Sequence, residues 1–296
     1  MTNFDFIGRK NIWFALSGAV IIIGLIGLFT RGLTFGIEFK GGTLFDVKFG
    51  QSITVDRARS ALVPLNLQGS VIQIAGNRQN EVLVRSPQTS IAKQERVKAA
   101  YKKLGATDFS IQSVGPSWGR QLTQGTLIAL VLSLAIVLVF VALRFEPKMG
   151  GAAVIALFHD VLVALGLYAL VGREVTTSTV AAFLTILGYS MYDTIVVFDR
   201  VRENAAGLKK QTYSEMVNQS VNQVLRRSIN TSLTAVIPVA SLFFFGGETL
   251  RDFAFALLVG LISGAYSSIF IASPILAMWK EAEPKYRSIR QKLAKA

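Results

Sequence analysis

The sequence of 296 residues contains no cysteine and a single histidine, His159. The absence of cysteine excludes disulfides, thiol nucleophiles and thiolate metal sites. One histidine excludes a metal centre built from several imidazoles. The sequence also has no glycine-rich nucleotide-binding loop. We therefore expect no metal, no nucleotide and no other bound cofactor, so any energy input must come from a membrane gradient or from a partner.

Charged residues are also scarce, at 17% of the chain against about 25% in a typical soluble domain. Hydrophobic residues make up 51%, and the mean hydropathy is +0.47. A helix needs about 20 mostly apolar residues to cross a bilayer. The sequence predicts an α-helical membrane protein with six transmembrane helices. They are expected at Trp13–Thr30, Gly125–Leu143, Gly150–Val171, Ser178–Phe198, Ser228–Phe245 and Phe253–Trp279.

The net charge of +13 is distributed unevenly between the two sides of these spans. Termini and loops on one side hold sixteen Lys and Arg, whereas the short loops on the other side hold only Arg173 and Arg251. The positive-inside rule then places both termini in the cytoplasm. The basic charge is a topology signal and a contact for anionic membrane lipid. We expect no nucleic-acid partner.

The chain divides accordingly into four parts. Residues 1–30 form a cytoplasmic N-terminus and the first transmembrane helix, which we expect to be retained and not cleaved as a signal peptide. Residues 31–121 form an extracytoplasmic domain. Residues 122–279 form a bundle of five transmembrane helices with a cytoplasmic loop at 199–227, and residues 280–296 form a basic cytoplasmic tail.

The extracytoplasmic segment alternates between strand and helix patterns. The expected elements are a strand at Thr43–Phe49, a helix at Val55–Leu62 capped by Thr54, strands at Ser70–Ala75 and Glu81–Ser86 around a Gly76–Asn77 turn, a helix at Ser90–Leu104 capped by Ser90, and a strand at Phe109–Val114. This βαββαβ order predicts a small ferredoxin-like α+β domain. It contains no nucleophile–base pair. Two interpretations stay open: a module that binds substrate, or one that only packs on a partner subunit.

Ionisable residues inside a span are costly, so each is a candidate functional group. They are His159 and Asp160 in the third span and Asp193 in the fourth. His159 and Asp160 are adjacent and point about 100° apart on a helix. We therefore expect that they do not serve one site directly. A structural hydrogen bond and a proton relay both stay open for them.

Asp193 shares a polar helical face with Thr185 and Tyr189, which we expect to point into the bundle. Its predicted partner is Arg227, at similar depth in the fifth span. The pair is interpreted either as a proton site or as a static buried ion pair. Further polar residues expected around it are Ser190, Thr194, Asn230 and Thr231. Asp199 is expected to anchor the cytoplasmic end of the fourth span, with Arg200 and Arg202 reaching lipid headgroups.

Two other patterns concern helix packing. Gly260 and Gly264 form a G-x-x-x-G motif, which predicts close contact with another helix. Pro238 and Pro274 predict interruptions in the last two spans.

Tyr192–Asp193 matches one half of the intramembrane aspartyl protease signature, but the G-x-G-D half is absent. We therefore predict that the protein is not an enzyme.

Several motifs together resemble the SecD/SecF family, and specifically its SecF members. Gly36-Ile-Glu-Phe-Lys-Gly-Gly-Thr43 is similar to the GIDFxGGT element, which includes Gly36, Gly41 and Gly42. The stretch Leu184–Asn204, with Asp193, Asp199 and Arg200, resembles the SecF signature. Arg227–Ser232, Val114–Pro116 and His159–Asp160 are also SecF-like. The resemblance covers nearly the whole chain, although Tyr192 stands where the family often has Asn.

This resemblance implies half of a twelve-span unit related to the RND superfamily, located in the bacterial inner membrane. It implies a role in Sec-dependent protein export, in which SecF and SecD use the proton motive force to promote late steps of preprotein translocation after SecA. The implied partners are SecD, the SecYEG channel, the translocating preprotein, YajC and YidC. Carried over by motif, Asp193 and Arg227 are the proton-coupling residues.

Two alternatives to this function remain. One is an RND-type proton-coupled subunit for a small molecule or lipid, against which the single small extracytoplasmic domain argues. The other is a scaffold that stabilises the channel. The scaffold predicts that Asp193 and Arg227 can be replaced by apolar residues without loss of function.

Overall fold

The computed structural model describes residues 4–75, 79–208, 211–246 and 248–293. The chain forms two compact units. The helical unit comprises Met1–Thr34, Leu130–Glu174 and Ser178–Ala296. The mixed unit comprises Phe35–Ala129 and Val175–Thr177.

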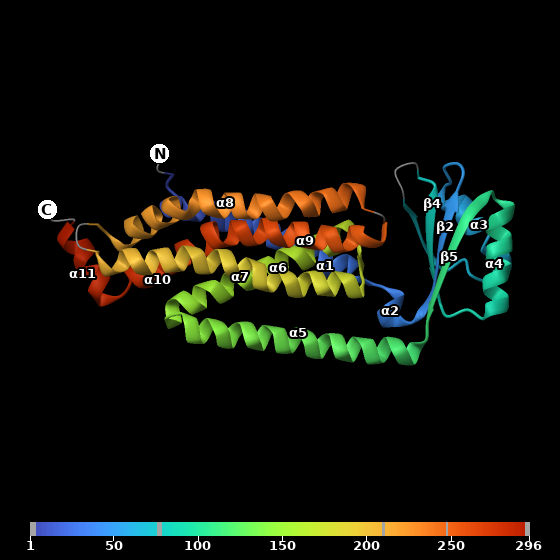
Figure 1. The fold of residues 1–296 in the computed structure, drawn as a ribbon, viewed down its shortest axis with the longest axis horizontal. Helices are drawn as coiled ribbons and strands as arrows, with labels where there is room; N and C mark the ends of the chain where they lie inside the picture. Colours follow the sequence, from blue (N-terminus) through green and yellow to red (C-terminus); the bar gives the residue numbers. More distant parts are fainter. Residues whose placement is uncertain (1–3, 76–78, 209–210, 247, 294–296) are drawn as a thin grey trace. The chain divides into compact units, whose positions relative to one another are not determined.

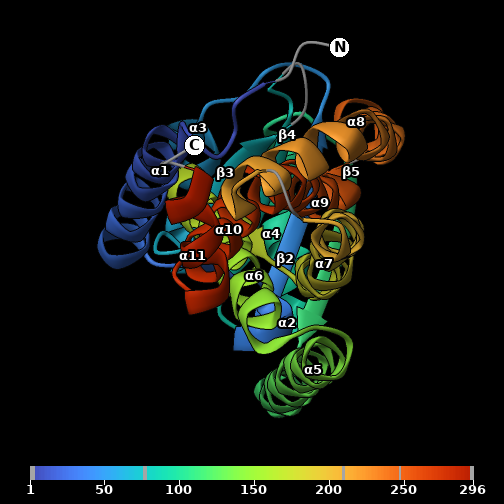
Figure 2. The same cartoon turned by 90° about the vertical axis from the view of Figure 1, so that its left-hand side faces the viewer.

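Long apolar helices dominate the chain (Figure 1). They are α1 (Lys10–Arg31), α5 (Pro116–Arg144), α6 (Pro147–Val171), α7 (Thr177–Ala206), α8 (Tyr213–Phe245), α9 (Glu248–Ser267) and α10 (Ser273–Glu281). Counting Leu250–Glu281 as one span, six helices in the described ranges are long and apolar enough to cross a membrane. The six predicted spans are therefore confirmed, and the same composition defines a helical multi-pass membrane protein. Viewed from the end with the chain termini, α5 lies at the edge of the bundle (Figure 2).

Several helices extend well beyond their apolar cores. The largest extension is in α8, which begins fifteen residues before the predicted start at Ser228. A capping box starts it: Thr212 Oγ1 accepts from the Glu215 backbone N–H, and Glu215 accepts from the Thr212 N–H. Such caps satisfy helix-terminal amides independently of hydropathy, so a hydropathy window misses this polar first part.

Glycines allow the helices of this unit to approach closely. A Cβ added at Gly24 would lie 2.9 Å from the Gly166 Cα, so α1 and α6 meet backbone to backbone. A Cβ at Gly264 would lie 2.9 Å from the Ser190 Cβ, and one at Gly260 would collide with Ile186. The predicted close packing at Gly260 and Gly264 is confirmed, and α7 is the partner helix.

The last span contains a break near its predicted interruption. Residues Ser268–Ala272 form a π-helical turn between α9 and α10, and Pro274 lies in the first turn of α10. A proline removes one backbone donor, and a π-turn is a common way for a helix to adjust locally. The Ser273 hydroxyl donates to the Ser268 carbonyl (2.8 Å) within this break. At Pro238, by contrast, α8 is one continuous helix.

The mixed unit contains one antiparallel sheet with the order β3-β4-β2-β5. Its strands are β2 (Gly42–Phe49), β3 (Val71–Ala75), β4 (Glu81–Ser86) and β5 (Ala106–Val114). The helices α3 (Val55–Ser60) and α4 (Ile91–Lys103) lie on one face (Figure 1). The predicted order of strands and helices is confirmed. The predicted Gly76–Asn77 turn lies outside the described residues.

Both predicted helix caps in this unit are confirmed. Thr54 Oγ1 accepts from the Arg57 N–H, and Ser90 Oγ accepts from the Lys93 N–H. The core between helices and sheet includes the fully buried Tyr101, whose hydroxyl donates to the Ala58 carbonyl and ties α4 to α3. Burial raises the pKa of the Tyr101 phenol above its ordinary value.

Some short elements have no clear sequence signal. They are β1 (Thr34–Phe35), α2 (Ile37–Lys40), the 3-10 turn Val63–Leu65, β6 (Glu174–Val175) and α11 (Pro284–Leu293). β1 pairs with β6 in a two-stranded sheet. All of these except the ten-residue α11 have two to four residues, which is too few side chains for a periodic pattern.

A cluster of charges joins the start of α6 to the end of α10 and the chain that follows it. Lys280 contacts Glu146 (2.5 Å), and Lys148 contacts Glu283 (3.0 Å). Burial acts to raise the pKa of Glu283, but the hydrogen bond from Lys148 and the charges of Lys280 and Lys148 outweigh it. The pKa of Glu283 is therefore lowered below its ordinary value of 4.5.

This shift predicts acid-sensitive docking of α11. A lowered folded-state pKa contributes stability above pH 4.5, and that contribution is lost as the pH falls through the folded-state value. We expect hydrogen exchange of the α11 amides, corrected for intrinsic rates, to accelerate between about pH 5 and pH 3. The Glu283→Gln variant should show faster exchange already at neutral pH and little further change. An identical pH response in the two proteins would contradict the assignment.

Candidate functional site

Asp160 lies at the centre of a buried polar cluster formed by three helices. Its side chain on α6 is 0% exposed. Ser190 of α7 donates to Oδ2 (2.5 Å), as does Ser267 of α9 (2.8 Å). Ser263 of α9 donates to Oδ1 (2.6 Å), and His159 Nδ1 lies 3.0 Å from the same atom. Each carboxylate oxygen therefore has two partners, and the carboxyl group ties α6, α7 and α9 together.

The contact between His159 and Asp160 corrects a prediction. We expected that adjacent residues on a helix do not serve one site, but Nδ1 of the ring contacts the neighbouring carboxylate. A fixed angle between Cα–Cβ bonds does not prevent two long side chains from bending toward each other. The ring also stacks on Tyr266, with centroids 6.0 Å apart. The hydrogen bonds of Asp160 to serines of α7 and α9 agree with the structural hydrogen bond left open from the sequence, and the proton relay stays untested.

Asp193 is buried on α7, as is Ser190, and it contacts α8. It is 2% exposed, and the Ser232 hydroxyl lies 3.2 Å from its Oδ2. Next to it, the hydroxyls of Thr194 and Ser268 lie 2.8 Å apart and link α7 to the π-helical turn. Asp193 thus has a much sparser set of donors than Asp160. A carboxyl group with few fixed donors can change its protonation state with less rearrangement of its neighbours.

The predicted Asp193–Arg227 ion pair is wrong for this structure. The side chain of Arg227 is exposed, and within the described ranges no salt bridge joins it to Asp193. The face of α8 that meets α7 carries the buried Ser228 and Ser232 instead. Residues 227 and 232 differ by five positions, which is about 140° around a helix. Equal depth in the membrane therefore did not imply a shared face.

The other polar residues predicted around Asp193 are only partly brought together. Tyr189 Oη donates to the Thr231 carbonyl (3.1 Å), so these two join α7 to α8. Asn230 and Thr185 are exposed, and the Thr185 hydroxyl donates to the Ala181 carbonyl of its own helix. The predicted inward-facing stripe is therefore wrong for Thr185. A hydroxyl that bonds its own backbone does not require a buried position.

Asp199 and its neighbouring arginines make contacts within the protein at the end of the apolar part of α7. Arg144 of α5 contacts both carboxylate oxygens of Asp199 (2.8 and 2.7 Å), and Arg202 contacts Oδ1 (2.9 Å). Arg200 donates to Gln223 of α8 (2.6 Å). The side chains of Arg200 and Arg202 stay partly exposed, at 39% and 47%, so their contact with lipid headgroups stays a prediction. α7 and α8 both continue as helices past their apolar parts and supply these partners.

The two adjacent glycines after α2 have backbone conformations that favour glycine. Gly41 has φ 73° and Gly42 has φ 145°. A Cβ at Gly42 would lie 2.6 Å from the Ser86 carbonyl oxygen, and one at Gly41 would lie 3.0 Å from the Pro116 Cα. The double glycine therefore lets β2 begin beside the end of β4 and the start of α5. The third motif glycine, Gly36, donates its N–H to the Val175 carbonyl (3.0 Å).

This geometry predicts that Gly42→Ala destabilises the mixed unit by about 1–3 kcal/mol, through backbone strain and the clash with Ser86. Hydrogen exchange of the β2 and β4 amides in the full chain would measure the effect. Gly69→Ala is the matched control, because a Cβ at Gly69 meets open space. Equal protection in the two variants would show that the double glycine has no structural role.

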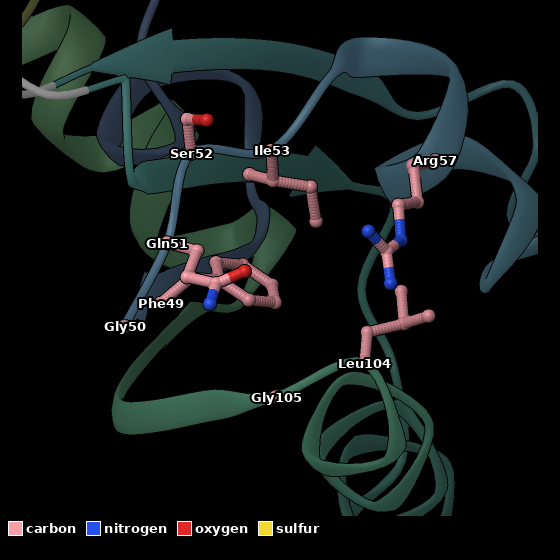
Figure 3. Close-up of a pocket in the computed structure, with 8 residues that line it drawn as sticks. All are labelled: Phe49, Gly50, Gln51, Ser52, Ile53, Arg57, Leu104 and Gly105. Atoms are coloured by element: carbon pink, nitrogen blue, oxygen red, sulfur yellow. The ribbon is translucent and has the colours of Figure 1, made fainter.

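The mixed unit has a pocket of about 360 Å³ at the end of α4 (Figure 3). It is lined by Phe49, Gly50, Gln51, Ser52, Ile53, Arg57, Leu104 and Gly105. Arg57 is the one charged residue in this lining, and the lining has no acid–base pair. The pocket is a candidate contact site. Within the described ranges no group of three or more His, Asp or Glu side chains is placed to hold a metal.

Two of the three serines of the Asp160 cluster, Ser263 and Ser267, were missed from the sequence, whereas Ser190 was among the polar residues expected in the spans. Ser263 and Ser267 are four residues apart on α9, which also carries Gly260 and Gly264. The two serines donate to Asp160 of α6, and the two glycines pack against α7. This combination of small and hydroxyl residues on one helix was the sequence signal available for the cluster. Serine is common in membrane helices, and its spacing alone does not identify a partner carboxylate.

Six apolar helices, a buried carboxylate cluster and the double-glycine element define a multi-pass membrane protein with intramembrane ionisable groups. The family model "Protein export membrane protein SecD/SecF, C-terminal" matches residues 93–282, and the model "SecD/SecF GG Motif" matches residues 26–53. The chain belongs to the SecD/SecF family.

Individual relatives agree with this membership. The chain is 38% identical to "Protein translocase subunit SecF" of Streptomyces coelicolor, over 98% of this chain and 80% of that protein. It is 40% identical to the protein of the same name from Desulfurispirillum indicum, over 94% and 93%. The crystal structure of SecDF from Thermus thermophilus, described as a translocon-associated membrane protein, has a TM-score of 0.87 at 35% identity. That match covers 94% of this chain and 39% of the SecDF chain.

Proposed function

We propose that this chain is the SecF component of a Sec protein-export complex and promotes preprotein translocation across the membrane. The observation that carries this proposal is the similarity to proteins named SecF over nearly the whole of this chain and over 80% and 93% of those proteins. The double-glycine element and the buried carboxylates lie inside the two matched family models, at Gly41–Gly42 and at Asp160 and Asp193.

SecD is the proposed direct partner. In the Thermus SecDF protein, the match to this chain covers 39% of the polypeptide, so a further SecD part accompanies the SecF-like part there. We propose that SecD supplies the corresponding part here and completes a twelve-span unit of the RND type. The other proposed partners are the SecYEG channel, the preprotein in transit, YajC, YidC and membrane lipid.

We propose the bacterial inner membrane as the location, with both termini in the cytoplasm. The excess of Lys and Arg on one side of the spans supports this orientation. Residues 31–121 are then the extracytoplasmic domain and 280–296 the cytoplasmic tail. The strand order β3-β4-β2-β5, with two helices on one face, is that expected of a ferredoxin-like domain and supports that assignment. Its role is to contact the emerging preprotein or the SecD domain.

The proposed energy source is the proton gradient, with Asp193 as the proton acceptor and no enzymatic activity or bound cofactor in the chain. Each proton that crosses a potential of about 150–200 mV releases about 3.5–4.6 kcal/mol. That is enough to drive a cycle between conformations that differ by a few kcal/mol. The contact that would respond to the proton is the hydrogen bond from Ser232 on α8 to Asp193 on α7. Protonation of Asp193 would weaken this contact, and the proposed role of Arg227 is to stabilise the charged form in another state.

Copurification tests the proposed complex. The full chain with an affinity tag, extracted from native membranes in mild detergent, should retain SecD and the SecYEG channel, identified by mass spectrometry. An unrelated six-span protein carrying the same tag is the control. Recovery of the chain without SecD or channel subunits, at the level of the control, would contradict the proposal.

A further inference from the structure

An apolar groove of about 520 Å³ runs along the helical unit between α1, α6, α8 and α9. Its apolar lining includes Val163 and Leu167 of α6. Leu16 and Val20 of α1 and Phe255 and Ile262 of α9 also line it. All these residues lie in helices long and apolar enough to cross a membrane, so the groove lies at the depth of the hydrocarbon core of a bilayer.

The polar groups that line the groove are already bonded within the protein. The Ser17 hydroxyl donates to Tyr266 Oη (3.1 Å), which donates to the Trp13 carbonyl (3.2 Å). Ser263 and His159 Nδ1 are directed to Asp160. A ligand rich in polar groups would lose its hydration without gaining comparable bonds here. The lining therefore suits an aliphatic chain.

The length of the groove matches one leaflet of a bilayer. It runs along α9 from Phe255 to Tyr266, which is 11 residues or about 16 Å at 1.5 Å per residue. Half of a hydrocarbon core of about 30 Å is about 15 Å. A single acyl chain of one leaflet therefore spans the groove from end to end.

Positive charge lies at one end of the groove. The guanidinium of Arg173 lies over the rings of Phe243 and Phe255, both of which line the groove (5.3 and 4.7 Å). Arg173 also pairs with Asp252 (2.6 Å). Arg31, at the end of α1, donates one hydrogen bond to the Leu170 carbonyl (2.8 Å), and its side chain is exposed. No ion pair engages Arg31 in the described part of the chain. Its remaining donors suit a phosphate group.

We propose that this groove binds one acyl chain of an anionic phospholipid from the leaflet next to the Arg31 end of α1, with the lipid phosphate at Arg31. A bound chain covers the face of His159 that lines the groove. It thereby shields the Asp160 cluster from exchange with the surrounding membrane. This site is independent of the proposed export function.

Lipid retention by the full chain tests the proposal. The chain is reconstituted in bilayers of phosphatidylglycerol, extracted in mild detergent, and the lipid retained is counted by native mass spectrometry. The wild type should retain one phosphatidylglycerol through detergent washing. Val20→Trp, which fills the groove, should retain none. Ile22→Trp is the matched control on an exposed position of the same helix and should behave as the wild type.

The headgroup contact has its own variant. Arg31→Gln should weaken retention of phosphatidylglycerol about fivefold and leave retention of the zwitterionic phosphatidylcholine unchanged, as expected for one basic side chain near a lipid surface. Arg9→Gln, at the opposite end of α1, should change neither. Equal loss in the Arg31 and Arg9 variants would overturn the assignment of the phosphate to Arg31.

A photoreactive residue at Val20 in the otherwise native chain provides a measurement that does not depend on a groove-filling variant. Irradiation in the bilayer should yield a lipid adduct at Val20 that survives dilution with unlabelled lipid, whereas the same probe at Ile22 should yield a rapidly exchanging one. Adducts that exchange equally fast at both positions would overturn the proposal. So would capture of another protein, or of a second copy of the chain, in place of lipid.

Discussion

Asp193→Asn is expected to abolish the proton-gradient-dependent phase of preprotein translocation while the chain remains folded and assembled with SecD. The substitution keeps the size of the side chain and its capacity to accept from Ser232, but it removes the titratable group. The gradient supplies a free energy of about 3.5–4.6 kcal/mol per proton. Without a titratable group at position 193, this free energy would no longer act on the contact between α7 and α8. Translocation in vesicles with a proton gradient should fall to the rate measured without one.

Two variants separate this proton site from a general effect of charge loss. Asp199→Asn removes a carboxylate from the same helix, but that carboxylate contacts Arg144 and Arg202 outside the buried face. It should retain most of the gradient response, because partly exposed ion pairs contribute little. Asp193→Glu keeps a titratable group and should retain part of the response. Full gradient-dependent translocation by Asp193→Asn would contradict the proton-site assignment.

Asp160→Ala is expected to have the largest effect on stability, with a loss of about 3–5 kcal/mol, which is the usual cost of breaking a buried network that surrounds a charge. The side chain accepts from three serines on two other helices, and each hydroxyl would lose its acceptor. The cavity adds to the loss. Unfolding of the purified chain in mixed micelles with a graded content of denaturing detergent would measure the change.

A double-mutant cycle shows whether the cluster acts as a unit. The Ser190→Ala substitution alone should cost about 1–2 kcal/mol, and in the Asp160→Ala background it should cost much less, because its partner is already absent. Ser241→Ala is the control for hydroxyl loss, since that side chain is exposed and bonds only its own helix. Strict additivity of Asp160→Ala and Ser190→Ala would contradict the cluster.

The positions of the spans and of the sheet elements could be predicted because each depends on local pattern. Apolar runs of about 20 residues identify membrane helices, and alternation with capping residues identified the strands and helices between Gly42 and Val114. The sequence also predicted that Gly260 and Gly264 face another helix, since small residues allow close approach. Helix ends were less predictable, because α8 starts at a polar cap that hydropathy does not register.

Partner choice between helices could not be predicted in the same way, because it depends on helix rotation and not on depth. Arg227 has the depth of Asp193, but Ser232 occupies the facing position. Arg144 contacts Asp199 across 55 positions of sequence, and no local pattern links them. The Asp160 cluster joins a carboxyl group on α6 to three serines on two other helices, and no local pattern marks these serines as partners of Asp160. Such sites become visible only when the packing of the helices is known.

The most direct test of gradient-driven export by this chain uses a preprotein stalled partway through the channel. The preprotein is held in inverted membrane vesicles after ATP for SecA has been removed. Imposing a proton gradient should complete translocation in vesicles that contain this chain together with SecD. Vesicles that lack the chain, or that carry Asp193→Asn, should leave the preprotein stalled. Equal completion in vesicles with and without the chain would contradict a role for it in gradient-driven export.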